Sequence, residues 1–376
     1  MKNHKVIISV SNDLSSDQRV HKVCTTLHSN GFEVLLVGRL LKNSSTLTDR
    51  HYQTKRMRLL FTKGVMFYLE LQIRLFLFLL FHSCDSLHAN DLDTLLPNYL
   101  ASKWKRKKLV YDSHEFFTEV PELQNHPWKK RIWEFVESLT FPKVEYIFTV
   151  NNSIAHEYEK KYNKKLHVLR NVPSALQLAH VSKVTLPSFL ESKPYAILQG
   201  AGINVDRGAE ELVEAMLSVE NISLLIVGSG DVLPRLKQMV LSKGLQEKVF
   251  FIGKLPYQQL MQYTRGAAFG ITLDKDTNLN YRFSLPNKIF DYAAAGIPVL
   301  ASSLVETRRI MEQYSIGLLV ESHEPIHIAQ RMFEMVQNPD LIKKWKQNAL
   351  KLSKENNWEL EVKELVEIYQ HQIRIN

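Results

Sequence analysis

Short apolar runs alternate with helical stretches from one end of this chain to the other, and this alternation constrains the fold most. Such runs, rich in β-branched and aromatic residues, are typical of parallel strands covered by helices on both faces. Strands are expected at 5–10, 33–37, 86–89, 108–111, 146–150 and 166–169, and again at 195–199, 223–227, 249–252, 268–272, 298–301 and 317–320. Six strands per half predict an α/β protein with two doubly wound, Rossmann-like sheets.

The length of 376 residues also favours two domains, because a single hydrophobic core rarely grows to serve so long a chain. The stretch 173–194 is polar, lacks a clear periodicity and contains three prolines, so it is the best linker candidate. Residues 357–369 have the pattern of an amphipathic helix. The expected organisation is a first domain at 1–175, a linker at 176–194, a second domain at 195–355 and a C-terminal helix at 356–376.

Composition indicates a soluble enzyme in a reducing compartment. The chain is 45% hydrophobic and 23% charged, and its two cysteines, Cys24 and Cys84, form neither a disulfide framework nor a metal-binding motif. No signal peptide precedes the first strand. The longest uninterrupted apolar run, Leu75 to Phe81, is seven residues, short of the roughly 20 needed to cross a bilayer. We therefore expect a cytoplasmic protein without a metal site.

The positive charge lies in the first half. Residues 1–180 contain 26 Lys and Arg against 17 Asp and Glu, whereas the remainder contains 22 of each. Basic residues at 55–58, Lys63 and 103–108 bracket an aromatic and leucine-rich helix at 65–81, a combination that favours an anionic membrane surface. The alternative is a buried crossover helix. No nucleic-acid-binding motif accompanies the basic run, so nucleic acid is not an expected partner.

The segment 284–302 carries the strongest functional pattern. Pro286 suits the first turn of a helix and Gly296 suits its left-handed end, so Lys288 and Asp291 should lie about one turn apart near the positive end of the helix. A cation and a carboxylate placed there can hold a phosphate and a sugar hydroxyl. The alternative is an ordinary amphipathic helix with a glycine cap.

This segment resembles the donor-site helix of GT-B glycosyltransferases, in particular the retaining glycosyltransferase family 4, whose members read PNK, an aliphatic and an aromatic residue, E-Y and then AAG-x-PV. Asp291 stands here where the family has Glu. The resemblance implies two domains facing a central cleft, with the final helix crossing back to the first. It also implies transfer of a sugar from a nucleotide diphosphate sugar to an acceptor hydroxyl, with no metal or other cofactor.

A glycine-bearing turn, 200–208, follows the predicted strand at 195–199 and includes Arg207. Glycines let backbone N–H groups approach a phosphate, and the guanidinium adds a bidentate cation. The turn is not a dinucleotide fingerprint, because Val205 occupies the third glycine position. It resembles the QGG-x5-RG turn of family 4, which implies that Arg207 and Lys288 together stabilise the donor pyrophosphate as catalytic cations. The alternative for Arg207 is a solvated residue at a helix start.

The resemblance implies further donor contacts in the second half. The turn after the strand at 223–227 resembles a motif that packs near the nucleotide, and the loop after 249–252 would line the nucleobase. The donor-binding candidates are Gly200, Gly202, Gly228, Gly230, Gly253, Lys254, Leu255, Ser284, Pro286, Asn287 and Asp291. Asp291 would hold the ribose. The family's earlier acid, eight residues before it, is replaced by Phe283, and its role is open among Asn280, Tyr281, Arg282 and Ser284.

Polar residues also follow three predicted strands of the first half. Ser15, Ser16, Asp17 and Arg19 come after the first strand, either as acceptor-side and anion contacts or, for the first three, as a helix cap. The stretches 88–93 and 111–115 resemble the HAHDL and DSHE motifs, which implies a histidine beneath the sugar ring. That catalytic role is open among His88, Asn90 and His114, and Asp91 or Glu115 would orient the acceptor hydroxyl.

The sequence thus predicts a retaining glycosyltransferase of surface polysaccharide or lipid-linked glycan biosynthesis. Its expected partners are a nucleotide-sugar donor, a glycan or lipid-linked acceptor and an anionic membrane surface, on whose inner face it would be peripheral. Two alternatives are a nucleotide-sugar 2-epimerase of the same fold and a non-catalytic nucleotide-sugar-binding protein.

Overall fold

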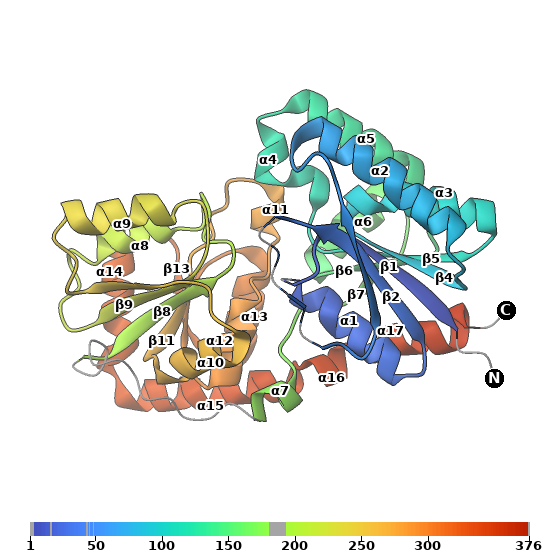
Figure 1. The fold of residues 1–376 in the computed structure, drawn as a ribbon. Helices are drawn as coiled ribbons and strands as arrows, with labels where there is room; N and C mark the ends of the chain where they lie inside the picture. The colour runs from blue at the N-terminus through green and yellow to red at the C-terminus, as the bar shows by residue number, and fades with distance from the viewer. Residues whose placement is uncertain are drawn as a thin grey trace. The chain divides into compact units, whose positions relative to one another are not determined.

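The computed structural model describes residues 4–15, 17–42, 44, 46–47, 49–179 and 193–374. The chain divides into two compact units (Figure 1). Unit 1 comprises Met1–Asn171 and Val362–Asn376, and unit 2 comprises Val172–Glu361. These division points differ by several residues from the expected ones at 175 and 355. Most of the expected linker, 180–192, lies outside the described residues.

Unit 1 contains a seven-stranded sheet in which all strand pairs are parallel, with the order β3-β2-β1-β4-β5-β6-β7. The strands are β1 (Lys5–Asp13), β2 (Glu33–Leu40), β3 (Gln53–Arg58), β4 (Ser86–Asn90), β5 (Lys108–Ser113), β6 (Tyr146–Thr149) and β7 (His167–Val168). Six of them were predicted. The edge strand β3 was missed because its sequence, QTKRMR, is charged and half-exposed and so carries no apolar signal.

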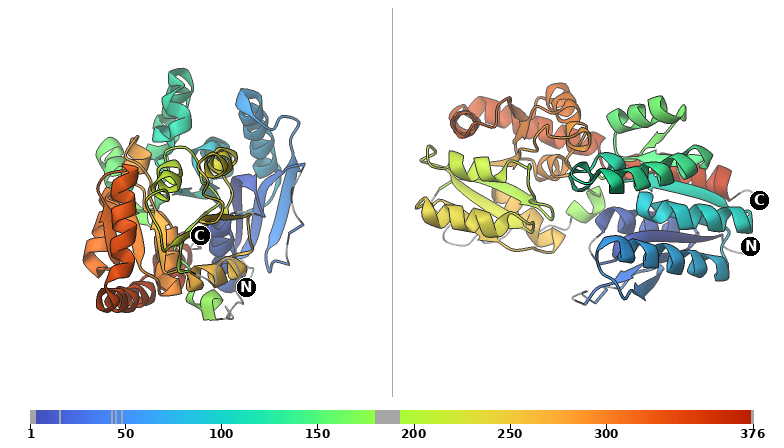
Figure 2. Two further views of the ribbon diagram at one scale, coloured as in Figure 1. Left: turned by 90° about the vertical axis from the view of Figure 1, so that its left-hand side faces the viewer. Right: turned by 90° about the horizontal axis from the view of Figure 1, so that it is seen from above.

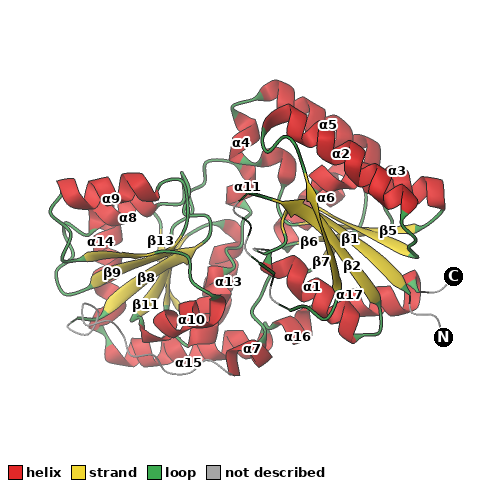
Figure 3. Cartoon of the chain, in the orientation of Figure 1, coloured by secondary structure: helices red, strands yellow, loops and turns green. Residues whose placement is uncertain are grey.

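Helices cover both faces of this sheet (Figure 3). On one face lie α1 (Gln18–Ser29) and α17 (Lys363–Ile368), and on the other lie α2 (Gly64–Phe81), α3 (Leu92–Lys105), α4 (Pro121–Gln124) and α5 (Pro127–Thr140). The helix α6 (Asn152–Tyr162) links β6 to β7.

The C-terminal segment returns to unit 1, as expected, but not as one helix. It is broken into α16 (Trp358–Glu361), α17 and a π-helical turn at Tyr369–Ile373. The return is fixed by Tyr369, which is completely buried and packs edge-on against Phe32, with ring centroids 5.5 Å apart.

Unit 2 contains a second parallel sheet, of six strands in the order β10-β9-β8-β11-β12-β13, and all six were predicted. The strands are β8 (Tyr195–Gly200), β9 (Ser223–Gly228), β10 (Val249–Ile252), β11 (Phe269–Thr272), β12 (Val299–Ser302) and β13 (Gly317–Val320). Separate apolar clusters cover its two faces, and Figure 2 shows the helices that surround it.

The helices of unit 2 connect these strands. They are α7 (Ala175–Ala179), α8 (Ala209–Ala215), α9 (Leu233–Ser242), α10 (Tyr257–Gly266), α11 (Leu279–Arg282), α12 (Lys288–Ala295), α13 (Val305–Tyr314), α14 (Pro325–Gln337) and α15 (Pro339–Glu355). Gly296 ends α12 in the left-handed conformation, with φ 71°. The predicted end of this helix is therefore confirmed.

The helix α2 corrects the expectation drawn from the seven-residue apolar run. Counted over its full 18 residues, α2 is the one helix of the described residues long and apolar enough, by length and composition alone, to cross a membrane. The alternative of a buried crossover helix is also only partly right. Four side chains of α2 are buried, namely Phe67, Leu71, Leu75 and Leu79.

Candidate active site

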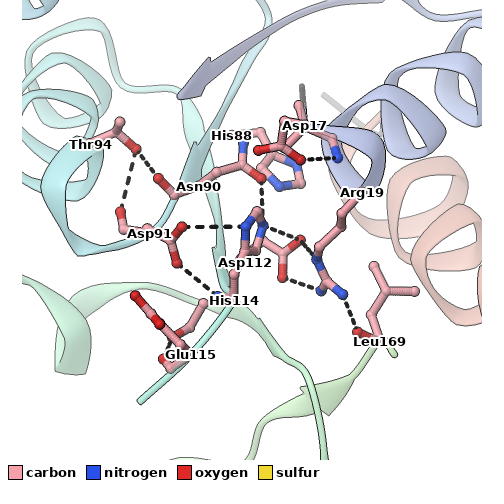
Figure 4. Close-up of polar contacts among 12 residues, drawn as sticks. Asp17, Arg19, His88, Asn90, Asp91, Thr94, Asp112, His114, Glu115 and Leu169 are labelled. Carbon is pink, nitrogen blue, oxygen red and sulfur yellow. Dashed lines mark hydrogen bonds and ion pairs between the residues drawn. The ribbon is translucent and has the colours of Figure 1, made fainter. Parts of the chain in front are cut away.

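Polar residues of unit 1 gather at the carboxyl ends of β4 and β5, beside the start of α1 (Figure 4). The strand order reverses between β1 and β4, and ligands of doubly wound sheets bind beyond the carboxyl ends of the strands at such a point. Of the predicted residues, the structure brings together Arg19, Asn90, Asp91 and His114 there.

His114 lies at the centre of this cluster. Its Nδ1 is 3.3 Å from Oδ2 of Asp91, and its Nε2 is 3.3 Å from Oδ2 of Asp112 and 3.1 Å from Oδ1 of Asn90. Burial acts to lower the pKa of His114, but the two carboxylates outweigh it and raise this pKa to about 9. Both ring nitrogens therefore carry protons at neutral pH and face oxygen acceptors.

Asp112, which sequence reasoning did not select, anchors the cluster. Arg19 donates from Nε to Oδ2 of Asp112 at 3.0 Å and from Nη2 to Oδ1 at 2.6 Å, and its Nη1 reaches the Leu169 carbonyl. Burial opposes ionisation of Asp112, but Arg19 and His114 hold the pKa of this carboxyl well below its usual value. The prediction of Arg19 as an anion contact for a ligand is corrected, because its guanidinium is buried against an internal anion.

His88 is also placed differently from the expectation. It lies within β4, is completely buried, and its Nδ1 is 2.7 Å from the Tyr369 hydroxyl. Burial lowers the pKa of His88 to about 4, so it is neutral at pH 7. A side chain enclosed in this way cannot lie beneath a sugar ring. Asn90 is 2% exposed and donates to the Ser9 carbonyl, so among the three candidates His114 is the one that reaches the surface of the cluster.

The segment between β1 and α1 supports the helix-cap alternative in part. Asp17 is the N-cap of α1, and its carboxylate accepts from the Val20 N–H at 3.0 Å. Ser15 instead bonds to Asp13 through both its N–H and its hydroxyl, and Ser16 lies outside the described residues. Glu115 is half-buried, and its backbone carbonyl accepts from the Ser113 hydroxyl.

A further acid, Asp93, lies beside the cluster. Burial, together with the nearby charge of Asp91, raises the pKa of Asp93 to about 7. Asp93 lies in the first turn of α3, two residues after Asp91. Its position just after a predicted strand is the signal by which sequence reasoning could have selected it as a site residue.

In unit 2 the reversal of strand order falls between β8 and β11. The glycines there have two different roles. A Cβ on Gly228 would lie 1.8 Å from the Gly200 carbonyl oxygen, and one on Gly230 would lie 2.0 Å from that of Ile203, so these two glycines allow the two turns to pack together. A Cβ on Gly202 would meet its nearest atom at 3.9 Å, an ordinary van der Waals contact, so close packing does not require a glycine there.

Arg207 projects from the turn before α8 and is held by two contacts. Its Nη1 donates to Oδ2 of Asp274 at 2.9 Å, and its guanidinium lies 4.7 Å from the ring centroid of Tyr281. Burial acts to lower the pKa of Arg207, but Asp274 and Tyr281 raise it above its usual value. The solvated-arginine alternative is therefore wrong. Asp274 lies two residues after the end of β11, and attention to acids just beyond the carboxyl ends of strands would have selected it.

Lys288 and Asp291 lie one turn apart in α12, as predicted. Burial lowers the pKa of the Lys288 ammonium, although the nearby Asp274 carboxylate opposes this shift. Asp291 accepts from the Tyr257 hydroxyl at 2.8 Å and from Nε2 of Gln199 at 3.2 Å. Sequence reasoning missed both donors, since a tyrosine and a glutamine carry no motif of their own.

The remaining predicted donor residues lie just before α12 or in the loop after β10. Ser284 and Pro286 precede α12, and the Ser284 hydroxyl is buried with no hydrogen-bond partner among the described residues. Asn287 occupies the N-cap position of α12, but its side chain makes no capping hydrogen bond. The loop of Gly253, Lys254 and Leu255 follows β10, and its first two residues are exposed. Within the described parts of the chain, no group of three or more His, Cys, Asp or Glu side chains is placed to hold a metal ion.

Comparison with solved structures identifies the fold. Sucrose-phosphate synthase from Thermosynechococcus elongatus superimposes with a TM-score of 0.81 at 14% identity, covering 100% of both chains. The Anabaena protein HepE, solved with UDP and glucose, has a TM-score of 0.73 at 15% identity and covers 98% of this chain and 100% of its own. The chain has two α/β units, each built on a parallel sheet, and its similarity to these solved structures identifies the fold as GT-B.

Sequence families then identify the protein class. Residues 17–172 match the family described as Glycosyltransferase Family 4, and residues 187–352 match Glycosyl transferases group 1. An uncharacterized glycosyltransferase of Methanocaldococcus jannaschii is 24% identical over 295 residues, which are 74% of this chain and 72% of that protein. The chain therefore belongs to the group 1 glycosyltransferases and is a glycosyltransferase enzyme.

Proposed function

We propose that this enzyme takes its sugar from a nucleotide diphosphate sugar and transfers it to an acceptor hydroxyl with retention at the anomeric carbon. The observation that carries the proposal is the pair of cations in unit 2: Arg207 is paired with the buried carboxylate of Asp274, and the same carboxylate acts electrostatically on Lys288. That HepE was solved with UDP and glucose supports the same class of donor.

In this proposal the two cations act on the leaving diphosphate. Negative charge builds on the diphosphate as the bond to the sugar breaks, and preorganised cations in a partly dry site stabilise that charge most effectively. Asp291, fixed by Tyr257 and Gln199, holds the ribose hydroxyls. No step in this scheme requires a metal or another cofactor, so activity should be unchanged when EDTA is added.

Unit 1 holds the acceptor in this scheme. The imidazolium of His114 supplies a fixed positive charge, while Asp91, whose side chain is 20% exposed, is available to orient an acceptor hydroxyl. The acceptor we favour is a lipid-linked glycan of surface polysaccharide synthesis, met at the cytoplasmic face of an anionic membrane. Residues 1–180 contain 26 basic against 17 acidic residues, and this excess of positive charge supports this location.

A screen of nucleotide sugars by thermal shift, followed by NMR of the product, tests the proposal. We expect one donor to raise the melting temperature and its sugar to appear in the product with unchanged anomeric configuration. Inversion would overturn the retaining mechanism, and 2-epimerised donor formed without acceptor would favour the epimerase. If the wild type does not hydrolyse the donor, or if Arg207→Ala hydrolyses it equally fast, a non-catalytic binding protein would be favoured.

A further inference from the structure

The helix α2 carries two rows of apolar side chains, one buried and one exposed. Phe67, Leu71, Leu75 and Leu79, spaced four residues apart, are buried. A second row at the same spacing, Val65, Leu69, Ile73, Leu77 and Phe81, is exposed, with Phe81 78% exposed. Residues four apart lie on one side of a helix, so α2 is packed along one side and presents a continuous apolar stripe along another.

Exposed apolar side chains also recur on the neighbouring helices. Trp128, Ile132, Phe135 and Leu139 in α5 recur at helical spacing and are all exposed. The helices α2, α3 and α5 lie side by side on the same face of the unit 1 sheet (Figure 2). The ring of Tyr68 in α2 meets that of Trp133 in α5 at 5.0 Å, which joins the outer helices directly.

Between them, α3 contributes the exposed side chains Leu100 and Trp104, the latter 76% exposed. We refer to the exposed sides of α2, α3 and α5 as the apolar face. Exposed apolar side chains that recur on three adjacent helices mark an interaction site, because isolated exposed side chains, such as those of unit 2, are ordinary.

Basic residues adjoin the apolar face. Lys103 in α3 and Lys143 both lie 5.6 Å from the ring centroid of Tyr99, and Lys129 lies at the same distance from the ring of Trp128. Arg106 and Arg131 are exposed nearby in sequence. Lysine and arginine beside exposed tryptophan is the composition that binds the headgroup region of anionic bilayers.

The packing of α2 argues against a membrane-spanning role in this fold. Glu70, in the second turn of α2, accepts hydrogen bonds from the backbone N–H groups of Leu60 and Phe61. It also pairs with Arg74 at 2.8 Å. Its buried row is also committed to the protein. A helix with one side packed, one side apolar and charges at mid-length suits the plane of the interface, not the bilayer core.

We propose that the apolar face is a membrane-binding surface, in which the exposed rows of α2 and α5 enter the headgroup region of an anionic bilayer while the adjacent lysines and arginines contact lipid phosphates. The inference deepens the proposed function, since it rests on an acceptor that resides in a membrane. A second copy of this chain is a less suitable occupant, because two identical basic rims would face each other.

Vesicle binding of the full-length chain tests the proposal. Sedimentation with phosphatidylglycerol–phosphatidylcholine vesicles should retain the wild type, and Ile73→Gln/Leu77→Gln and Phe135→Gln should each bind about tenfold more weakly, because each removes apolar area without changing charge. Leu241→Gln and Phe333→Gln change equally exposed apolar residues of unit 2 and should bind like the wild type. Pure phosphatidylcholine and high salt should each weaken binding.

Tryptophan fluorescence adds a readout of depth. Trp104 and Trp128 are exposed, Trp133 is half-buried against Tyr68, and Trp345 and Trp358 are buried. Brominated lipids should therefore quench the wild type and should quench Trp104→Phe/Trp128→Phe less. Absent binding, equal binding by unit 1 and unit 2 variants, or a dimer that the double variant abolishes, would overturn the proposal. Donor binding measured by thermal shift in the same variants should be unchanged, so failure of the membrane surface is distinguishable from failure of the donor site.

Discussion

At the scale of single residues, Asp274 is the group whose role the structure defines most sharply. Its side chain is 1% exposed, pairs with Arg207 at 2.9 Å and acts electrostatically on Lys288. Where a diphosphate would approach these cations, the carboxylate acts as an internal counter-ion and opposes the second negative charge. Asp274 therefore positions Arg207 and, in the proposed donor site, should limit how tightly a nucleoside diphosphate is held.

Asp274→Asn should lower the stability of the ligand-free enzyme by about 1–3 kcal/mol, because it removes the charged partner of Arg207, whose side chain is still partly reached by water. The same variant should bind a nucleoside diphosphate several-fold more tightly. Thermal unfolding with and without the nucleotide, together with calorimetric titration, checks both effects. Unchanged nucleotide affinity would show that Asp274 does not compete with the phosphate.

Lys288→Ala should reduce kcat/KM for the donor by about ten- to a hundredfold while leaving the fold intact, because the ammonium stabilises charge on the leaving diphosphate and packs little apolar surface. Steady-state kinetics at varied donor concentration, with circular dichroism as the measure of folding, tests this. Lys344→Ala, at an exposed position of α15, is the matched control. If the two variants have equal kinetics, the proposed donor site is misplaced.

At the scale of elements, His114 ties the end of β5 to the end of β4 by contacts with Asp112 and Asp91. Because its folded pKa is raised from 6.5 to about 9, these contacts stabilise the fold fully below pH 6.5, and this contribution is lost as pH rises through 9. The raised pKa corresponds to about 3 kcal/mol. Urea unfolding at pH 6.5 and 9.5 should show this loss in the wild type but not in His114→Gln, and equal losses would contradict the assignment.

Elements with strong local signals were predicted well, and those defined by distant contacts were not. Pro286 and Gly296 mark α12 because proline and glycine restrict the backbone locally, and the structure has the helix between them. The strand β3 is fixed by pairing with β2 despite a charged sequence. The same reason explains the site: His88 and His114 look alike in sequence, but only the fold encloses the first and surrounds the second with carboxylates.

At the scale of the whole molecule, the chain returns to its first unit, and a buried pair fastens the return. The Tyr369 hydroxyl lies 2.7 Å from Nδ1 of His88, and both residues are completely buried. Lys108 also reaches the Gln372 carbonyl, and Nδ1 of His167 is 2.7 Å from a carboxylate oxygen of Glu364. Residues 281 positions apart thus share one core, so the C-terminal segment is part of the unit 1 fold.

Tyr369→Phe tests how far unit 1 depends on this return. The variant keeps the ring packing on Phe32 but leaves a buried nitrogen of His88 without its partner, which should cost about 1–3 kcal/mol. Equilibrium unfolding in urea should show the loss, and hydrogen exchange should show faster opening of residues 362–373. Tyr146→Phe, whose hydroxyl donates to the exposed Glu145, should cost less than about 1 kcal/mol. Equal effects of the two variants would mean that the His88–Tyr369 contact does not hold the C-terminal segment in place.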